Sequence, residues 1–174
     1  AKLQTLGEIT PSRRSGVIYR NSDDNPFLNS IESELNSILY AGQGATKTAF
    51  EIEDDDRGMR WIVLEDGNFN DLVSSVYTVG NAIGANDGAD NLLAAVFELY
   101  FTGTVEDNTY RSGLRTYWIY RYDRKAFYPF VPTGENEGER DRPTEARLGH
   151  DLRKHGLAIE KSLTEWMGLW GIPF

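Results

Sequence analysis

The order in which helix-like and strand-like segments follow one another most constrains the fold of this chain. One amphipathic helical segment precedes two strand-like segments, a second precedes three more, and a third helical segment follows those. Antiparallel strands grouped in this way bury one face of a sheet under helices. The order α-β-β-α-β-β-β-α therefore predicts an α+β fold with a mainly antiparallel sheet of about five strands. We expect a single domain over residues 1–174, with residues 1–20 forming an arm or a short first strand.

Cap and turn residues set the expected limits of these segments. Asn25 and Asn68 can cap the first and second helices, and Pro143 opens the third. The capping-box spacing over residues 162–165 predicts a short terminal helix that carries Trp166. The expected helices span 26–42, 68–83 and 143–155, and the expected strands span 49–53, 59–65, 92–102, 114–122 and 126–131.

The charge balance excludes several classes of partner. Lys and Arg number 18 against 27 for Asp and Glu, and 18 − 27 gives a net charge of −9. A chain this acidic repels nucleic-acid phosphates and anionic membrane surfaces, so no nucleic-acid partner is expected. The longest run without a charged residue, Leu72–Asn86, falls short of the roughly 20 apolar residues that span a bilayer, which argues against direct membrane insertion. The amino end lacks a secretory signal pattern, and a cytoplasmic location is expected.

The common signatures of enzymes and cofactor sites are missing from the sequence. The chain has no Cys, which excludes disulfides, thiolate nucleophiles and Cys-based metal sites. It contains no nucleophile elbow and no glycine-rich phosphate loop. His150 and His155 are five residues apart, which places them on different faces of a helix. The sequence therefore predicts a protein that is not an enzyme and that carries no cofactor.

Three adjacent carboxylates, Asp54 to Asp56, offer the alternative to this prediction. Oxygen ligands of this kind hold Mg²⁺ or Ca²⁺ when they converge. Neighbouring side chains at the end of a strand point apart, however, so a solvated turn is the favoured interpretation. The alternative is a metal-dependent enzyme or a small-ligand-binding regulator that uses this loop with Glu65 or Asp66.

Two aromatic clusters near the carboxyl end are the most unusual feature of the sequence. The first, over residues 127–132, is a strand interrupted by two prolines, and the second follows at residues 166–174. Because proline cannot donate to a sheet ladder, the first cluster is expected at a sheet edge or a bulge. Core packing is the favoured role for these aromatics, but Trp and Tyr beside a sheet edge also anchor peptides and subunits. The candidate partner-binding residues are Phe127, Tyr128, Phe130, Trp166 and Trp170.

Several strings in the chain resemble one protein family. The most specific are Phe127-Tyr128-Pro129-Phe130-Val131-Pro132 and Leu169-Trp170-Gly171-Ile172-Pro173. Other matching strings lie at 56–66, 71–73, 92–97, 120–122 and 140–142. From about Gly16 to its end the chain thereby resembles the PspA-associated protein PspAB family. The resemblance implies an accessory of phage-shock or envelope-stress systems and brings no catalytic residues.

The expected element order is also similar to that of the type III secretion chaperone and YbjN-like folds. Members of those folds use a sheet and flanking helices to dimerise or to hold a peptide, and the comparison rests on topology alone. These points together predict a non-enzymatic cytoplasmic accessory, chaperone-like, in a PspA-type membrane-stress response. Its expected partner is a protein, PspA-like, and a homodimer stays open.

Overall fold

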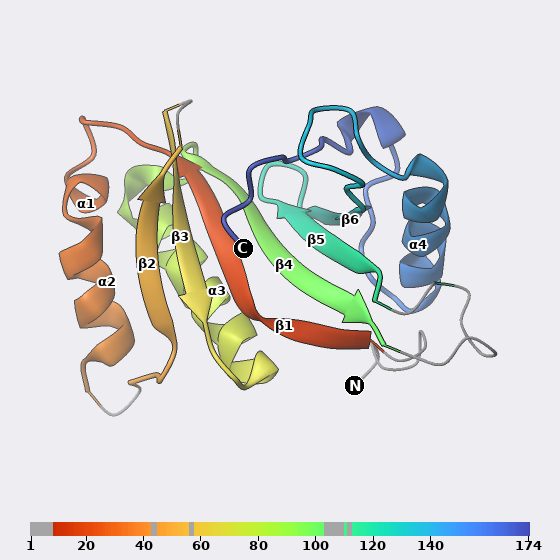
Figure 1. The fold of residues 1–174 in the computed structure, drawn as a ribbon. Coiled ribbons are helices and arrows are strands. Elements are labelled where there is room, and N and C mark those ends of the chain that lie inside the picture. The colour runs from red at the N-terminus through yellow and green to blue at the C-terminus, as the bar shows by residue number, and fades with distance from the viewer. Residues whose placement is uncertain (1–8, 43–44, 56–57, 103–109, 111–112) are drawn as a thin grey trace. The chain divides into compact units, whose positions relative to one another are not determined.

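The computed structural model describes residues 9–42, 45–55, 58–102, 110 and 113–174 (Figure 1). Over these residues the fold is α+β, with one antiparallel sheet of six strands in the order β2-β3-β1-β4-β5-β6 and four α-helices. The strands are β1 Ile9–Arg20, β2 Ala49–Asp54, β3 Met59–Glu65, β4 Leu92–Phe101, β5 Arg115–Arg121 and β6 Ala126–Phe130. The helices are α1 Pro26–Asn29, α2 Ile31–Tyr40, α3 Phe69–Ile83 and α4 Arg142–Lys154, with a π-helical turn at Gly84–Gly88 and a 3-10 turn at Leu163–Glu165.

The chain forms two compact units. The N-terminal unit is Arg13–Val96, and the C-terminal unit is Phe97–Phe174 together with the residues up to Ser12. The division falls inside β1 and β4, so each unit holds part of these two strands. That residues 1–174 form a single domain remains a prediction from the sequence. None of the helices over the described residues combines the length and the apolar character that crossing a bilayer requires.

In the N-terminal unit, β3 lies between β2 and β1 and runs antiparallel to both. Its Ile62 lies opposite Ile52 of β2 and Val17 of β1, which sets the register of the apolar face. Behind this part of the sheet lies α3, capped by Asn68, whose side chain accepts from the Asp71 N–H at 3.1 Å (Figure 1). The core of the unit is formed by Val17, Leu35, Leu39, Ile62, Leu64, Leu72, Val76 and Val79.

In the C-terminal unit, β5 and β6 form a hairpin whose register places Tyr117 opposite Phe130. The expected turn over residues 123–125 is confirmed, and its Lys125 has a positive φ of 53°. Helix α4 packs against β6, and Asp141 caps it by accepting from the Thr144 N–H at 3.1 Å. The outer edge of β6 is covered, because the Phe127 N–H donates to the Ala158 carbonyl at 2.7 Å.

The predicted α+β class and the five predicted strands are confirmed, but the strand count is wrong. Of the two alternatives for residues 1–20, an arm or a short first strand, the structure shows the strand: residues 9–20 form a sixth strand, β1, between β3 and β4. Its first half, Thr10 to Ser15, is polar and lacks the alternation of apolar and polar residues by which a strand is recognised in a sequence. Its second half is buried at Val17, Ile18 and Tyr19, as a central strand requires.

Two helix predictions also need correction. The expected helix over 26–42 is interrupted at Ser30, whose ψ of 26° separates α1 from α2. The expected terminal helix at Ser162 is only a 3-10 turn. The Ser162 hydroxyl bonds to that of Thr164 at 2.8 Å instead of capping a backbone N–H, so the capping-box spacing forms no box.

Candidate functional site

The two aromatic clusters predicted from the sequence pack on each other. The ring of Trp166 stacks on Tyr128 of β6 with centroids 6.2 Å apart, and Trp170 meets Phe130 edge-on at 5.2 Å. We call residues Trp166–Phe174 the tail. Aromatic residues recur at four-residue intervals in the tail, and each packs on an aromatic residue of the sheet. The two clusters therefore bury one another within the C-terminal unit.

Trp166 is the most deeply seated residue of the tail. Its indole N–H donates to the Glu160 carbonyl at 2.9 Å, and its ring lies over Gly149 of α4. A Cβ at Gly149 would lie 2.5 Å from the ring, so only glycine admits Trp166 at this depth. The Tyr128 hydroxyl donates to the Met167 carbonyl at 2.7 Å and ties the next tail residue to the sheet.

A buried ion pair holds the loop before α4 against the tail. Glu145 is 0% exposed and Arg140 is 7% exposed, and the guanidinium donates to the carboxylate through Nε at 2.9 Å and Nη2 at 2.6 Å. The carboxylate also accepts from the Val131 N–H at 3.0 Å, and Arg140 Nη1 donates to the Trp166 carbonyl at 3.0 Å. This pair therefore links the residue that follows β6, α4 and the tail through charge-assisted hydrogen bonds.

The five candidate partner-binding residues do not share one exposed surface. Tyr128, Phe130 and Trp166 are 2%, 0% and 3% exposed, which places them in the core of the C-terminal unit. Phe127 and Trp170 are half-buried and keep surface that a partner can contact. The prolines do mark an edge strand, since β6 ends the sheet order, but residues 158–160 cover that edge.

Trp170 lines a groove of about 400 Å³ in the C-terminal unit. Its indole N–H donates to the Glu139 carbonyl at 3.3 Å, which fixes the ring where it lines the groove. Arg115, 48% exposed, lies over the Tyr117 ring at 5.2 Å. The groove is lined by Arg115, Tyr117, Pro132, Gly134, Glu135, Leu169, Trp170, Gly171 and Ile172.

A buried carboxylate, Glu98, contacts two residues of the groove lining, Arg115 and Tyr117. Glu98 is 2% exposed, and it pairs with Arg115 at 3.6 Å. The Tyr117 hydroxyl lies 3.4 Å from Glu98 but donates to the Phe174 carbonyl at the shorter distance of 2.7 Å. The long ion pair orients Arg115 above the Tyr117 ring. Arg115 and Tyr117 were missed at the sequence level, although their two-residue spacing on a strand places them on one face.

Buried phenols in this unit predict a loss of stability in alkali. Burial raises the pKa of Tyr122 to about 12, and it also raises the pKa values of Tyr117 and Tyr128. Their contribution to stability is complete below the unfolded value of about 10 and is lost as pH rises through the folded values. We expect unfolding to accompany tyrosinate formation above about pH 10, measured by near-ultraviolet absorbance and circular dichroism. Ionisation of all tyrosines near pH 10 with the fold intact would contradict it.

The alternative metal loop finds no support in the described residues. Asp54 pairs with Arg60 at 2.8 Å, Asp66 accepts from Thr48 at 2.7 Å, and Asp56 lies outside the described residues. No group of three or more His, Asp or Glu side chains that could hold a metal ion occurs in the part of the chain that the structure describes.

Comparison with known proteins identifies a family for this chain. No curated protein and no solved structure matches this chain, so its likeness to the secretion-chaperone folds stays a prediction. The model of one family, described as PspA associated protein B, matches residues 1–174, and the chain therefore belongs to the PspAB family.

Proposed function

We propose that this chain is a non-enzymatic cytoplasmic accessory of a PspA-type membrane-stress response, and that it binds a PspA-like protein through the Trp170 groove. Membership of a PspA-associated family supports the link to PspA. The observation that carries the choice of site is the half-buried Trp170, held by its indole N–H on one side and open to the groove on the other. Tryptophan in such a setting is a frequent anchor of protein interfaces.

The lining of the groove supports a protein partner over a small substrate. Apolar surface from Leu169, Trp170 and Ile172 adjoins two charged groups, Arg115 and Glu135. Interfaces combine an apolar centre with a charged rim in this way, and the rim charges select the partner. The tail residues in the lining follow Trp166 and Met167, whose carbonyls accept hydrogen bonds from Arg140 and Tyr128, so a chaperone-like accessory could hold a partner segment with little rearrangement of its own.

The chemistry of the lining supports a role without catalysis. The groove holds one hydroxyl, that of Tyr117, which already donates to the Phe174 carbonyl and whose pKa is raised by burial. A group in that state is a poor base and a poor nucleophile. The remaining charged lining residues, Arg115 and Glu135, are suited to recognition of charge on a partner.

Reversing the charge at the rim is expected to weaken capture of the partner. The tagged wild-type chain should recover a PspA-like protein from native lysate, with more recovered under envelope stress, as read by mass spectrometry. Glu135→Arg should reduce this recovery because the glutamate lines the groove. Glu137→Arg makes the same change of charge at an exposed glutamate in the same loop, outside the groove, and should leave recovery unchanged.

Two results would contradict the proposal. Recovery of the bait alone, with and without stress, would favour a homo-oligomer or a different ligand over a PspA-like partner. Equal recovery by the wild type and by Glu135→Arg would mean that the partner does not bind at the groove, while the link to PspA through the family would still hold.

A further inference from the structure

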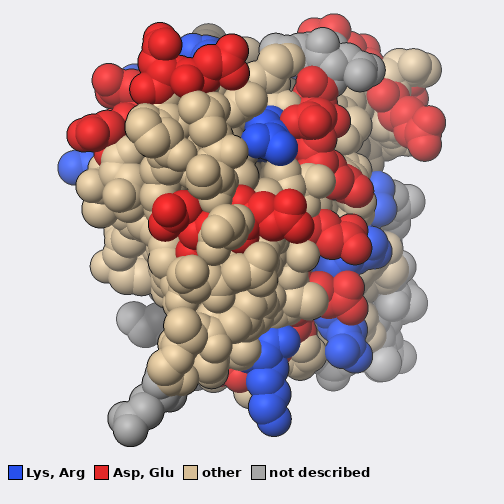
Figure 2. Space-filling model, turned by 90° about the vertical axis from the view of Figure 1, so that its left-hand side faces the viewer, with Lys and Arg blue, Asp and Glu red and all other residues tan. Residues whose placement is uncertain are grey.

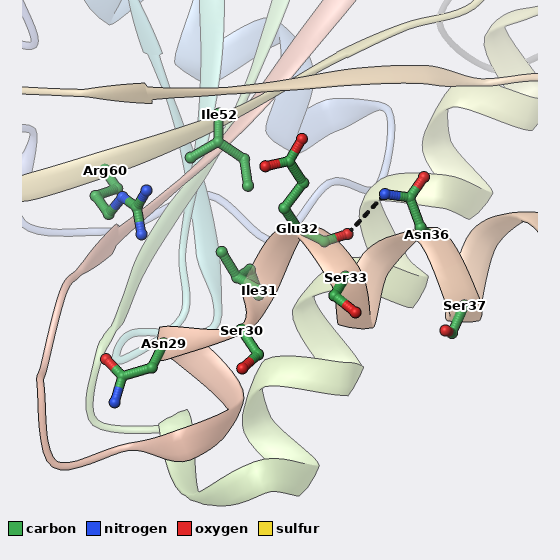
Figure 3. A pocket seen from close by; sticks show the side chains of 9 residues that line it. All are labelled: Asn29, Ser30, Ile31, Glu32, Ser33, Asn36, Ser37, Ile52 and Arg60. Atoms are coloured by element: carbon green, nitrogen blue, oxygen red, sulfur yellow. Dashed lines mark hydrogen bonds between the residues drawn. The ribbon is translucent and has the colours of Figure 1, made fainter.

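A second hollow, of about 760 Å³, lies in the N-terminal unit between α2 and the strands β2 and β3. Its strand side is formed by Ile52 and Arg60, and its helix side by residues of α1 and α2 (Figure 3). Glu32 reaches from α2 toward Ile52 in this view. The Asn36 amide N–H donates to the Glu32 carbonyl at 3.0 Å, which leaves the Asn36 amide oxygen as an acceptor. The lining of the hollow is therefore mainly polar, and its apolar side chains are Ile31 and Ile52.

The hollow runs beside an open sheet edge. β2 ends the strand order, and the N–H of Asp55, the residue that follows β2, donates to the Met59 carbonyl at 2.7 Å. Hydrogen-bonded pairs recur at every second residue of an antiparallel ladder, so Glu51 and Glu53 also use their backbone groups on β3. The N–H and C=O groups of Phe50, Ile52 and Asp54 then point away from β3. No described residue outside β2 hydrogen-bonds to them.

Helix α2 is attached to β2 at only one end of the hollow. The Tyr40 hydroxyl donates to the Thr48 carbonyl, the outward group just before β2, and the Tyr40 ring stacks on Phe50 at 6.0 Å. Toward Ile52 no such bond joins the helix and the strand among the described residues, and there the hollow opens. A groove between a helix and an edge strand is the geometry in which domains bind an extended peptide as an added strand.

The charges around this groove are almost all negative. α2 and β2 carry Glu32, Glu34, Glu51, Glu53 and Asp54 and no basic residue. The cation in the lining, Arg60, is already paired with Asp54 at 2.8 Å. Figure 2, which looks onto the side where α2 and β2 lie, shows acidic groups prevailing among the charged side chains. Charge complementarity therefore favours a basic occupant.

The alternation along β2 specifies where the basic residues of an occupant would lie. Glu51 and Glu53 are exposed on one face of the strand, and Ile52 lies between them on the face toward the hollow. A second copy pairing through β2 would set glutamates against glutamates, which destabilises a ladder. A nucleic acid would meet the same repulsion.

We propose that β2 binds an extended partner segment as an added strand, with Lys or Arg at alternate positions opposite Glu51 and Glu53. An uncharged residue between them faces Ile52 and the hollow. The backbone of that uncharged residue exchanges hydrogen bonds with Ile52, while the backbone groups of the basic residues point away. This site is distinct from the Trp170 groove and does not depend on the partner assigned there.

The test uses the purified full chain and a synthetic peptide in which lysine alternates with threonine, with both ends blocked. We expect saturable binding, measured by fluorescence anisotropy, and slower amide hydrogen exchange at Phe50, Ile52 and Asp54. N-methylation of the threonines should abolish binding because these residues bond to β2. N-methylation of the lysines, whose N–H groups point outward, should leave binding intact.

Charge variants separate specific pairing from general attraction. The double variant Glu51→Lys/Glu53→Lys should weaken binding of the lysine peptide by about tenfold or more, since two attractive cross-strand pairs become repulsive. Asp24→Lys/Asp90→Lys makes the same change of net charge at exposed residues that lie outside the hollow and outside α2 and β2, and should bind as the wild type does. Glu135→Arg should also bind normally, which keeps this test independent of the Trp170 groove.

Three results would overturn the proposal. One is the absence of saturable binding. Another is equal binding of the two N-methylated peptides, which would mean that no strand is added. The third is equal weakening by the two double variants, which would mean that binding depends on the net charge of the protein and not on pairing with Glu51 and Glu53.

Discussion

Glu145→Ala is expected to lower the free energy of unfolding by about 3–5 kcal/mol, because it leaves the Arg140 guanidinium buried without its partner. The variant also removes the acceptor of the Val131 N–H. Urea unfolding followed by tryptophan fluorescence measures the loss, since Trp166 and Trp170 both lie beside this ion pair in the C-terminal unit. For a domain of ordinary stability this is a large fraction of the total.

A double variant keeps this prediction testable if the single variant fails to fold. Arg140→Met/Glu145→Met removes both charges and replaces them with apolar side chains, so it should be clearly more stable than Glu145→Ala. Glu137→Ala, at an exposed position, should change stability by less than about 0.5 kcal/mol. If Glu145→Ala behaved like Glu137→Ala, the carboxylate would not be the buried link that the structure shows.

Trp166→Ala is expected to cost about 3–5 kcal/mol, because it empties a packed site between Tyr128 and Gly149. The matched control is the next residue, Met167, which is 57% exposed. Met167→Ala should stay within about 0.5 kcal/mol of the wild type, since its backbone carbonyl still accepts from Tyr128. Thermal and urea unfolding of the two variants measure the difference.

This comparison also separates the two roles considered for the aromatic clusters. If Trp166 lay at the surface and bound a partner there, its replacement by Ala, like that of Met167, would cost little stability. A large loss for Trp166→Ala with a small loss for Met167→Ala assigns Trp166 to the core. Similar small losses in both variants would contradict the burial of Trp166.

Local signals made most of the fold predictable. The caps at Asn25 and Asn68 accept the backbone N–H groups that their positions require, and five strands begin within one residue of their predicted starts. These features depend on residues close together in the sequence. For residues 1–20 the sequence left an arm or a short first strand open, because the strand character of β1 comes from pairing with β3 and β4, which lie far along the chain.

The groove could be predicted only in part, because it depends on long-range packing. The sequence singled out Trp170 and Phe130 as aromatic, but the contact between them joins residues 40 positions apart. Nothing local indicates that residues 158–160 cover the β6 edge, or that Arg140 reaches Glu145 and the tail together. The open β2 edge likewise follows from the strand order and not from a motif.

The central claim is that a PspA-like protein binds at the Trp170 groove, and calorimetric titration of the two purified proteins tests it most directly. We expect saturable heat with the wild type and with Glu137→Arg, and binding weaker by about tenfold or more with Glu135→Arg and with Trp170→Ala. No heat with the wild type, or the same affinity in all four proteins, would contradict the account.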